Sequence, residues 1–206
     1  DAVKLMLGKA PDAEQLGGAE MHCKISGVGD ALFSDDAEAI AWIKRCMGCL
    51  PSKFGDALPV SAARPPAMLS EQIARLIPSD LNKPFNMHSV LAGLLDADSG
   101  LEIQPLYARE VITCLARIAG VPIGIIANNS SERGGVIYPE SCRKMTRFIH
   151  FCGRSRIPLL FLADNPGLMV GEATEHAGML TEASDLLRAL SVCQTPRACL
   201  VIRKAY

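Results

Sequence analysis

The feature that most constrains the fold is a set of three apolar segments, which begin near residues 122, 157 and 198 and alternate with helical patterns. Short apolar segments without polar alternation are typical of strands that are buried on both faces. Strands that alternate with helices are joined by right-handed crossovers and form parallel sheets. The sequence therefore predicts an α/β chain with a mainly parallel sheet, in which the ends of these three strands lie side by side.

The middle segment runs into a loop that contains glycine. Residues 157–163 are apolar, and Asp164-Asn165-Pro166-Gly167 follows, where proline and glycine favour a sharp turn. Gly167 and Gly171 leave the backbone uncovered, so a ligand could approach its N–H groups. Apolar residues three and four positions apart then predict a helix, and they are Met179, Leu180, Ala183, Leu186, Leu187 and Leu190. This order of strand, loop and helix is typical of a ligand site at the carboxyl end of a strand.

Three polar segments follow the three strands and are predicted to form one wall of a binding cleft. They are residues 128–135, 164–171 and 204–206. His176, which Glu172 and Glu175 precede, is a candidate general acid or base, although a histidine at a helix start is more often structural. The sequence has no Walker loop, no Gly-x-Ser-x-Gly elbow and no His-Glu-x-x-His motif. We therefore expect backbone donors in glycine loops to stabilise charge in any reaction.

The remaining elements around this cleft follow from apolar spacing. Further strands are predicted at residues 101–103 and 111–118, ahead of the one at 122–127. Helices are predicted at residues 70–77, 87–95 and 139–152, and the inner face of the last consists of Met145, Phe148, Ile149 and Cys152. Six basic residues surround this helix, and both a solvated face and the attraction of a phosphorylated substrate are open readings of them. They are Arg133, Arg143, Lys144, Arg147, Arg154 and Arg156.

The first third of the chain is predicted to be helical and structural. A helix that begins after Asp12 is expected to continue through Leu16-Gly17-Gly18-Ala19, where each glycine costs about 1 kcal/mol relative to alanine. Ser34, Asp35 and Asp36 cap a second helix, whose predicted inner face is Ile40, Ile43, Met47 and Leu50. Residues 51–66 contain four prolines and no apolar period, so they are predicted to be a linker.

Composition argues against several kinds of partner. The formal net charge is −1, which gives no electrostatic footprint for nucleic acid. No apolar run approaches the roughly 18 residues that a membrane span needs. The eight cysteines lie mostly in apolar patterns, so we expect reduced thiols, and no metal at Cys46 and Cys49.

The chain begins at Asp1 and ends directly after an apolar strand, and we expect it to be a fragment of a longer protein.

Several motifs along nearly the whole chain resemble, in the same order, those of the carboxyltransferase (β) subunits of biotin-dependent acyl-CoA carboxylases. This family includes the propionyl-CoA, methylcrotonyl-CoA and geranyl-CoA enzymes and their transcarboxylase relatives. The matching motifs are Leu16-Gly17-Gly18-Ala19 with His22 and Ser26-Gly27-Val28, Ala116-Arg117-Ile118-Ala119-Gly120 running into Val121-Pro122-Ile123-Gly124, Lys144-x-x-Arg147-Phe148-x-x-Phe151-Cys152, Ile157-Pro158-Leu159, Pro166-Gly167-x-x-x-Gly171 and Arg203-Lys204-Ala205-Tyr206. The chain departs from the family at Ala183-Ser184-Asp185 and at Gly153, and these differences leave the acyl substrate open.

The resemblance implies a crotonase-like fold, which is a ββα spiral. Residues 1–50 would be the C-terminal tail of an N-terminal, acyl-CoA-binding domain. Residues 51–66 would be the linker, and residues 67–206 would be most of a C-terminal, biotin-side domain.

The resemblance also implies the reaction and its partners. Carboxybiotin on a partner carrier domain would release CO2, and the biotin enolate would take a proton from the α or vinylogous γ carbon of an acyl-CoA. The resulting carbanion would attack the CO2. ATP and bicarbonate would be used by a partner biotin carboxylase, and this chain would hold no metal. The parent would be a homo-oligomer, a hexamer in the family, in the cytoplasm or, in a eukaryote, in the mitochondrial matrix.

In the family, glycine-containing backbone holes stabilise the two enolate-like oxyanions, and both holes fall outside these 206 residues. The catalytic residues are therefore unknown, and we expect the fragment alone to be inactive. What the resemblance leaves here is a biotin-side pocket wall of Gly134, Gly135, Pro166, Gly167 and Gly171, with Asn128 and His176 in possible supporting positions.

Three alternatives stay open at this point. One is a biotin-linked acyl-CoA decarboxylase subunit of the same fold. Another is a crotonase-type hydratase or isomerase, which needs a pair of acidic catalysts, and Glu132, Glu172 and Glu175 are the candidates. A further one is a non-catalytic assembly piece, which would dock a second subunit through the Gly17-Gly18 helix and the strand edges.

Overall fold

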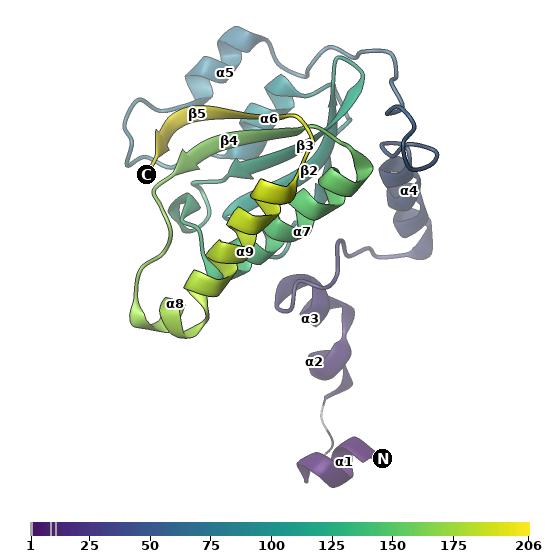
Figure 1. Cartoon of the computed structure of the whole chain (residues 1–206), viewed down its shortest axis with the longest axis vertical. Coiled ribbons are helices and arrows are strands. Elements are labelled where there is room, and N and C mark those ends of the chain that lie inside the picture. Colours follow the sequence, from purple (N-terminus) through teal and green to yellow (C-terminus); the bar gives the residue numbers. More distant parts are fainter. Residues whose placement is uncertain (1, 9, 11) are drawn as a thin grey trace.

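The computed structural model of the protein describes residues 2–8, 10 and 12–206. Its centre is a five-stranded sheet in the order β1-β2-β3-β4-β5 (Figure 1). The strands are β1 (Leu101–Ile103), β2 (Val111–Ile118), β3 (Val121–Asn128), β4 (Leu159–Asn165) and β5 (Arg197–Ala205). The predicted strands are therefore confirmed, with boundaries that move by only a few residues.

The sheet is mixed, so the prediction of a mainly parallel sheet is right for only half of it. β3, β4 and β5 are parallel to one another, as predicted, whereas β1 pairs with β2 and β2 with β3 in antiparallel fashion. The reason is local: Ala119 and Gly120, with φ of 52° and 80°, form a two-residue turn that folds β2 directly back onto β3. Two positive φ values at the turn match the right-handed twist of the flanking strands.

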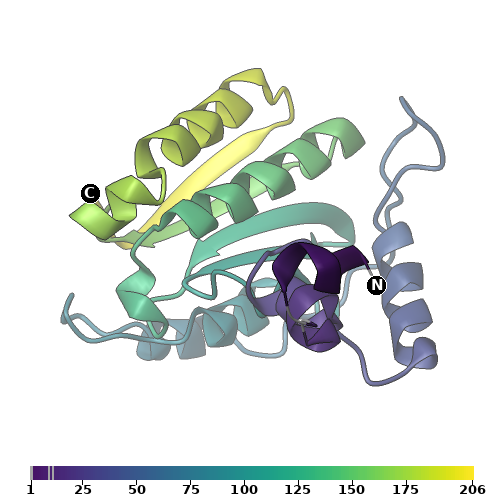
Figure 2. The ribbon, with the colours of Figure 1, turned by 90° about the horizontal axis from the view of Figure 1, so that it is seen from below.

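Helices cover both faces of the sheet, and each face has its own core. On one face lie α7 (Pro139–Ser155) and α9 (Met179–Val192), and on the other lie α5 (Ser70–Leu76) and α6 (Met87–Leu94), as Figure 2 shows. The predicted inner face of α7 is confirmed, since Met145, Phe148, Ile149 and Cys152 are all buried in the first core. The second core joins α6 to the other face of β2, β3 and β4. The helix predicted from Met179 to Leu190 is confirmed as α9; Met179 is buried in the first core, and Ala183, Leu186 and Leu190 pack against it. Leu180 and Leu187 are exposed.

The N-terminal segment extends away from the sheet as short helices (Figure 1). They are α1 (Ala2–Leu7), α2 (Ala13–Gly17) and α3 (Ala19–Lys24), followed by α4 (Asp36–Met47). The prediction that one helix runs through Gly17 and Gly18 is wrong, because Gly18 adopts an extended conformation and separates α2 from α3. An added Cβ at Gly18 would lie 2.5 Å from the carbonyl oxygen of Glu14, so the close approach at this turn requires glycine.

α4 begins at the predicted cap but buries a different face. Asp35 is the N-cap and accepts a hydrogen bond from the Glu38 N–H at 2.9 Å. Ile40, Ile43 and Met47 are exposed, however, and α4 packs against the first core through Trp42 and Cys46. Leu50, after the end of α4, packs against this core as predicted. Residues 48–69 form neither helix nor strand. Among the described helices, none has the length and apolar character that a membrane crossing requires.

Candidate functional site

The segments that follow β3, β4 and β5 meet at one edge of the sheet, as the sequence predicts. The Ile137 N–H donates to the carbonyl oxygen of Gly167 at 3.1 Å, and the Met169 N–H donates to that of Ile137 at 2.8 Å. On the other side, the Tyr206 N–H donates to the carbonyl oxygen of Asn165 at 3.1 Å. These backbone hydrogen bonds fix the loop after β4 between the other two segments, so the predicted meeting of the three segments is confirmed.

Two adjacent glycines shape the loop after β3. Gly134 and Gly135, in a short 3₁₀ turn η1 (Arg133–Gly135), have φ of 68° and 73°, which side chains disfavour. A Cβ at Gly135 would lie 3.2 Å from the carbonyl oxygen of Asp164, so this glycine lets the first loop approach the end of β4. The Asn128 amide donates to the Gly135 carbonyl oxygen at 3.1 Å. Asn128 thus supports the position of Gly135 rather than pointing into open space.

The loop after β4 presents backbone and apolar side chains to solvent. The Asn165 side-chain oxygen accepts a hydrogen bond from the Gly167 N–H at 2.8 Å, which forms the predicted tight turn after β4. Gly167 and Gly171 have φ of 120° and 153°, and a Cβ at Gly171 would meet no atom within 4 Å. Leu168, Met169 and Val170 between them are exposed. The loop therefore offers an uncovered, partly apolar surface beside the two glycines of η1.

His176 lies outside this group of contacts. It ends α8 (Glu172–His176), which begins at Gly171, and its side chain is exposed. Glu172 and Glu175, on the same short helix, are exposed as well. The third acid, Glu132, pairs with Arg109 at 2.7 Å. The acids proposed for a hydratase are thus divided between a solvated helix and an ion pair.

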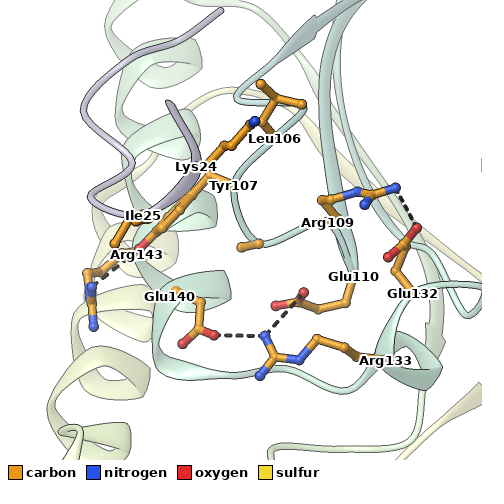
Figure 3. A pocket seen from close by; sticks show the side chains of 11 residues that line it. Lys24, Ile25, Leu106, Tyr107, Arg109, Glu110, Glu132, Arg133, Glu140 and Arg143 are labelled. Carbon is orange, nitrogen blue, oxygen red and sulfur yellow. Dashed lines mark hydrogen bonds and ion pairs between the residues drawn. The ribbon is translucent and has the colours of Figure 1, made fainter. Parts of the chain in front are cut away.

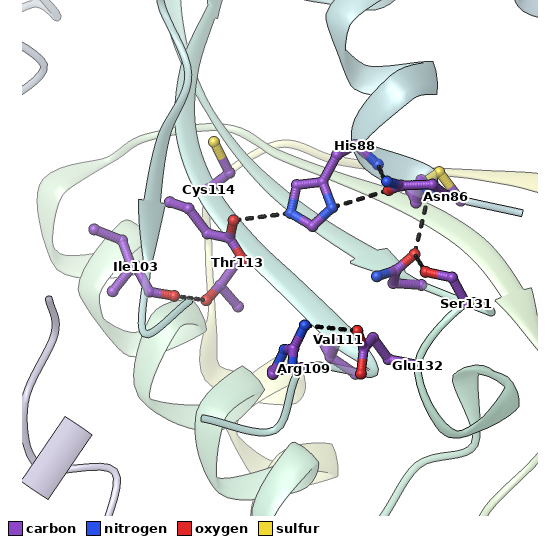
Figure 4. A network of polar contacts seen from close by, with 12 residues as sticks. Asn86, His88, Ile103, Arg109, Val111, Thr113, Cys114, Ser131 and Glu132 are labelled. Carbon is purple, nitrogen blue, oxygen red and sulfur yellow. Dashed lines mark hydrogen bonds and ion pairs between the residues drawn. The ribbon is translucent and has the colours of Figure 1, made fainter. Parts of the chain in front are cut away.

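A polar network beneath the loop after β3 was not predicted from the sequence. The Asn129 side-chain oxygen accepts hydrogen bonds from the Met87 N–H at 3.1 Å and from the Ser131 hydroxyl at 2.9 Å. Next to it, the His88 ring lies between Asn86 at 3.1 Å and Glu102 at 2.9 Å (Figure 4). These contacts tie α6 and β1 to the edge of the sheet. The contacts from Met87 to Asn129 and from His88 to Glu102 join residues far apart in sequence, so no local pattern signals them.

A charged cavity of about 450 Å³ lies at the same edge, between α3, η1 and the start of α7 (Figure 3). Arg109 and Glu132 form one ion pair in its wall, and Arg133 pairs with Glu140 at 2.8 Å and with Glu110 at 3.6 Å. Glu110 is almost fully buried and accepts a hydrogen bond from the Ser141 hydroxyl. Burial raises the pKa of the Tyr107 phenol in the same wall. The charges of this cavity largely neutralise one another.

The basic cluster predicted around α7 is therefore not one solvated surface. Arg143 pairs with Glu182 at 2.9 Å, and Arg147 pairs with Asp30 at 3.1 Å. Lys144 is buried, and its ammonium donates to the carbonyl oxygens of Tyr107, Ala108 and Val111 at 2.8, 3.3 and 2.6 Å. The inclusion of Lys144 in a solvated cluster was wrong, because this side chain crosses into the core to reach carbonyl groups. A basic surface that attracts phosphate does not follow from these contacts.

The cysteines are free thiols, and burial suppresses the ionisation of several of them. Burial raises the pKa of Cys114 to about 12 and that of Cys142 to about 11. Burial also raises the pKa of Cys46 and Cys49. Since the thiolate is the nucleophile and the metal ligand, these side chains are poorly suited to either role. Within residues 2–8, 10 and 12–206, no three His, Cys, Asp or Glu side chains form a group that could hold a metal ion.

Comparison with known proteins identifies the family. The model of the carboxyl transferase domain matches residues 1–206. The chain belongs to the carboxyl transferase family. It is 36% identical over 200 residues to the mitochondrial methylcrotonoyl-CoA carboxylase beta chain of Dictyostelium discoideum. This alignment covers 97% of this chain and 33% of the relative. It is 35% identical over 205 residues to the methylmalonyl-CoA decarboxylase subunit alpha of Veillonella parvula, which covers 99% of this chain and 40% of that relative.

A solved structure supports the same assignment. Transcarboxylase 12S, described as a hexamer with methylmalonyl-coenzyme A and methylmalonic acid bound, superposes with a TM-score of 0.92 at 28% identity. The match covers 97% of this chain and 39% of the transcarboxylase chain. The resemblance seen in the motifs is thus confirmed, and so is the crotonase-like fold. The chain spans less than half the length of these relatives.

Proposed function

We propose that the protein containing this chain is the carboxyltransferase component of a biotin-dependent acyl-CoA carboxylase. It would move CO2 from carboxybiotin, held on a partner carrier domain, to the α or γ carbon of an acyl-CoA. The observation that carries this proposal is the family match over residues 1–206, together with 36% identity to a methylcrotonoyl-CoA carboxylase beta chain. The partner biotin carboxylase would use ATP and bicarbonate.

The edge of the sheet fits a reaction that relies on backbone groups. Gly134, Gly135, Pro166, Gly167 and Gly171 would line the biotin side of the cleft, with Asn128 as their support. The hydrogen bonds between the loops after β3 and β4 favour this assignment, since they hold the glycines side by side. His176 would contribute less, because its exposed position on α8 gives it no fixed geometry. In the proposed arrangement residues 1–50 belong to the acyl-CoA-binding domain and residues 67–206 to the biotin-side domain.

The proposal includes an assembly and a compartment. The hexamer described for transcarboxylase 12S supports a homo-oligomeric parent. As the family resemblance implies, its cleft would combine the N-terminal domain of one subunit with the C-terminal domain of another. The relatives include a mitochondrial chain and bacterial chains, so the cytoplasm or the mitochondrial matrix would be the location.

A reconstituted assay tests the function. The full-length parent would be mixed with biotin carboxylase, biotinylated carrier, ATP and labelled bicarbonate, and a panel of acyl-CoAs would be offered. We expect ATP-dependent transfer of label into the acid-stable form of one acyl-CoA, and avidin, which sequesters biotin, should abolish it. Absence of label with every acyl-CoA would contradict the proposal.

A decarboxylase is the second candidate, because the chain is 35% identical to a methylmalonyl-CoA decarboxylase subunit. In that case avidin-sensitive release of CO2 from a carboxylated acyl-CoA would appear without ATP-dependent carboxylation. The hydratase alternative is tested separately through Glu132, Glu172 and Glu175. Their substitution by Gln should abolish activity in a hydratase and change carboxyl transfer little, since Glu172 and Glu175 are solvated and Glu132 pairs with Arg109.

A further inference from the structure

An arginine beneath the cleft wall connects all three of its segments. Arg203, near the end of β5, is 4% exposed, and Asp164, near the end of β4, is fully buried. The Arg203 Nε donates to Asp164 Oδ1 at 3.1 Å and its Nη2 donates to Oδ2 at 2.6 Å. Bidentate arginine–carboxylate pairs are strong and fix the relative orientation of the two side chains. Asp164 directly precedes Asn165, where the loop after β4 begins.

An irregularity of the sheet brings Arg203 to this position. Ala163 pairs with Val201 and Asn165 with Ala205, so that one residue of β4 lies opposite three residues of β5, Ile202 to Lys204. Such bulges redirect side chains and occur frequently next to active sites. Here the extra residues of β5 include Arg203, which forms the ion pair with Asp164.

The remaining donors of Arg203 reach a further segment. Its Nη1 donates to the carbonyl oxygens of Asp80 at 3.0 Å and Lys83 at 2.8 Å. Its guanidinium also lies over the ring of Phe85, 4.6 Å from the ring centre. The Phe85 N–H in turn donates to the hydroxyl of Ser130, in the loop after β3, at 3.1 Å. Arg203 therefore links the loop after β4, the end of β5 and, through residues 80–85, the loop after β3.

We propose that Arg203 is a positioning residue, which sets the relative placement of the three segments that form the cleft wall. This inference rests on the proposed carboxyl transfer, since the wall is where biotin would lie. Arg203 touches no reacting group and acts only through Asp164 and residues 80–85. Geometry matters here because a misplacement of about 1 Å can lower a rate roughly a hundredfold.

The test compares Arg203→Lys with Arg117→Lys in the full-length protein. Arg117 is a matched control, because it also donates to three carbonyl oxygens, those of Pro59, Gly120 and Gly48 at 2.6, 2.7 and 2.7 Å. It lies near the β2–β3 turn, at the other edge of the sheet. Both substitutions keep the positive charge but replace the several N–H donors of the planar guanidinium by a single ammonium group.

We expect Arg203→Lys to lower kcat about tenfold or more while the KM for acyl-CoA stays within about twofold, and Arg117→Lys to leave kcat unchanged. Assays run at a temperature at which circular dichroism shows both variants folded. Equal kcat values for the two variants would overturn the proposal. If Arg203→Lys does not fold, Phe85→Leu decides, because it removes the ring beneath the guanidinium and leaves the ion pair. A normal kcat in Phe85→Leu would then count against the proposal.

Hydrogen exchange separates this inference from the proposed function. The hydrogen-bonded amides of Gly167 and Met169 should exchange about tenfold faster in Arg203→Lys than in Arg117→Lys, whichever reaction the protein catalyses. Unchanged exchange there would refute the positioning role by itself. An inactive wild-type protein with faster loop exchange in Arg203→Lys would instead contradict the carboxyltransferase assignment alone.

Discussion

Lys144 shows at the residue scale how a charged side chain can act as a core residue. Lys144 lies on α7, and its side chain is buried. Its ammonium donates hydrogen bonds to the carbonyl oxygens of Tyr107, Ala108 and Val111. Burial lowers the pKa of Lys144 from 10.5 to about 8, although Glu102 and Glu110 oppose the shift. At neutral pH the side chain is still protonated and holds the segment before β2 against α7.

The lowered pKa of Lys144 gives stability a defined pH dependence. Between about pH 8 and pH 10.5 the unfolded state binds the proton and the folded state does not, so this group's contribution to stability rises with pH. The free energy of unfolding of the wild type relative to Lys144→Met should therefore increase by up to about 3 kcal/mol across this window. Urea unfolding at several pH values measures it. The raised thiol pKa values affect both proteins alike, so a flat difference would contradict the prediction.

The two glycines of η1 allow a matched comparison. Both have positive φ, so alanine at either position should lower the free energy of unfolding by about 1–2 kcal/mol. At Gly134 a Cβ would have only Val136, 4.0 Å away, as its neighbour, whereas at Gly135 it would lie 3.2 Å from the Asp164 carbonyl oxygen. Gly135→Ala should therefore cost about 1 kcal/mol more than Gly134→Ala and should also reduce carboxyl transfer. Equal losses of stability would contradict the prediction, since they would mean that the loops after β3 and β4 move apart at little cost in free energy.

The β2–β3 turn carries a prediction at the scale of an element. Ala119 and Gly120 both have positive φ, and the Asp96 carboxylate accepts hydrogen bonds from their N–H groups at 2.9 and 2.8 Å. Ala119 is exposed, and asparagine tolerates positive φ better than alanine does. Ala119→Asn should raise the free energy of unfolding by about 0.5–1 kcal/mol.

Gly120 is the counterpart of Ala119 in the same turn. A Cβ at Gly120 would lie 1.9 Å from the Ser61 carbonyl oxygen, so the chain around Ser61 would have to move. Gly120→Ala should cost more than the roughly 1–2 kcal/mol expected from backbone strain alone. Thermal unfolding of the two variants tests both, and stabilisation by Gly120→Ala would exclude the close approach.

The sequence predicted the buried face correctly for elements whose apolar residues lie on one face only. α7 has a single apolar face, and its period identifies the buried residues. α4 is apolar on two faces, so the period could not choose between Ile40 and Trp42, and packing against the core decided the outcome. In the same way, the edge of the sheet was predictable from strand order, whereas the links through Arg203 depend on a bulge that no local pattern reveals.

The whole chain is held together by contacts between its N-terminal segment and the sheet. Arg147 on α7 donates to the carbonyl oxygens of Gly27 and Val28 at 3.0 and 3.1 Å, and Gln104 donates to that of Gly27. Arg45 on α4 donates to the carbonyl oxygens of Asp98 and Gly100 at 3.0 and 2.7 Å. The two parts that the sequence divides at a linker are therefore joined through backbone carbonyl groups.

These contacts predict what happens when the linker is cut. Ser52 to Gly55 are exposed, and a Cβ at Gly55 would meet no atom within 4 Å, so a specific protease site inserted there should not disturb the fold. Arg117 holds Gly48 and Pro59 on either side of the cut. The cleaved protein should therefore elute as one species in size-exclusion chromatography, with both fragments present in the denaturing gel of that peak. Arg117→Met should release the N-terminal fragment at a lower urea concentration than wild type, because it loses the hydrogen bond to the Gly48 carbonyl oxygen that joins the two fragments. Separation of the fragments in the wild type without denaturant would mean that residues 51–66 act as a free tether.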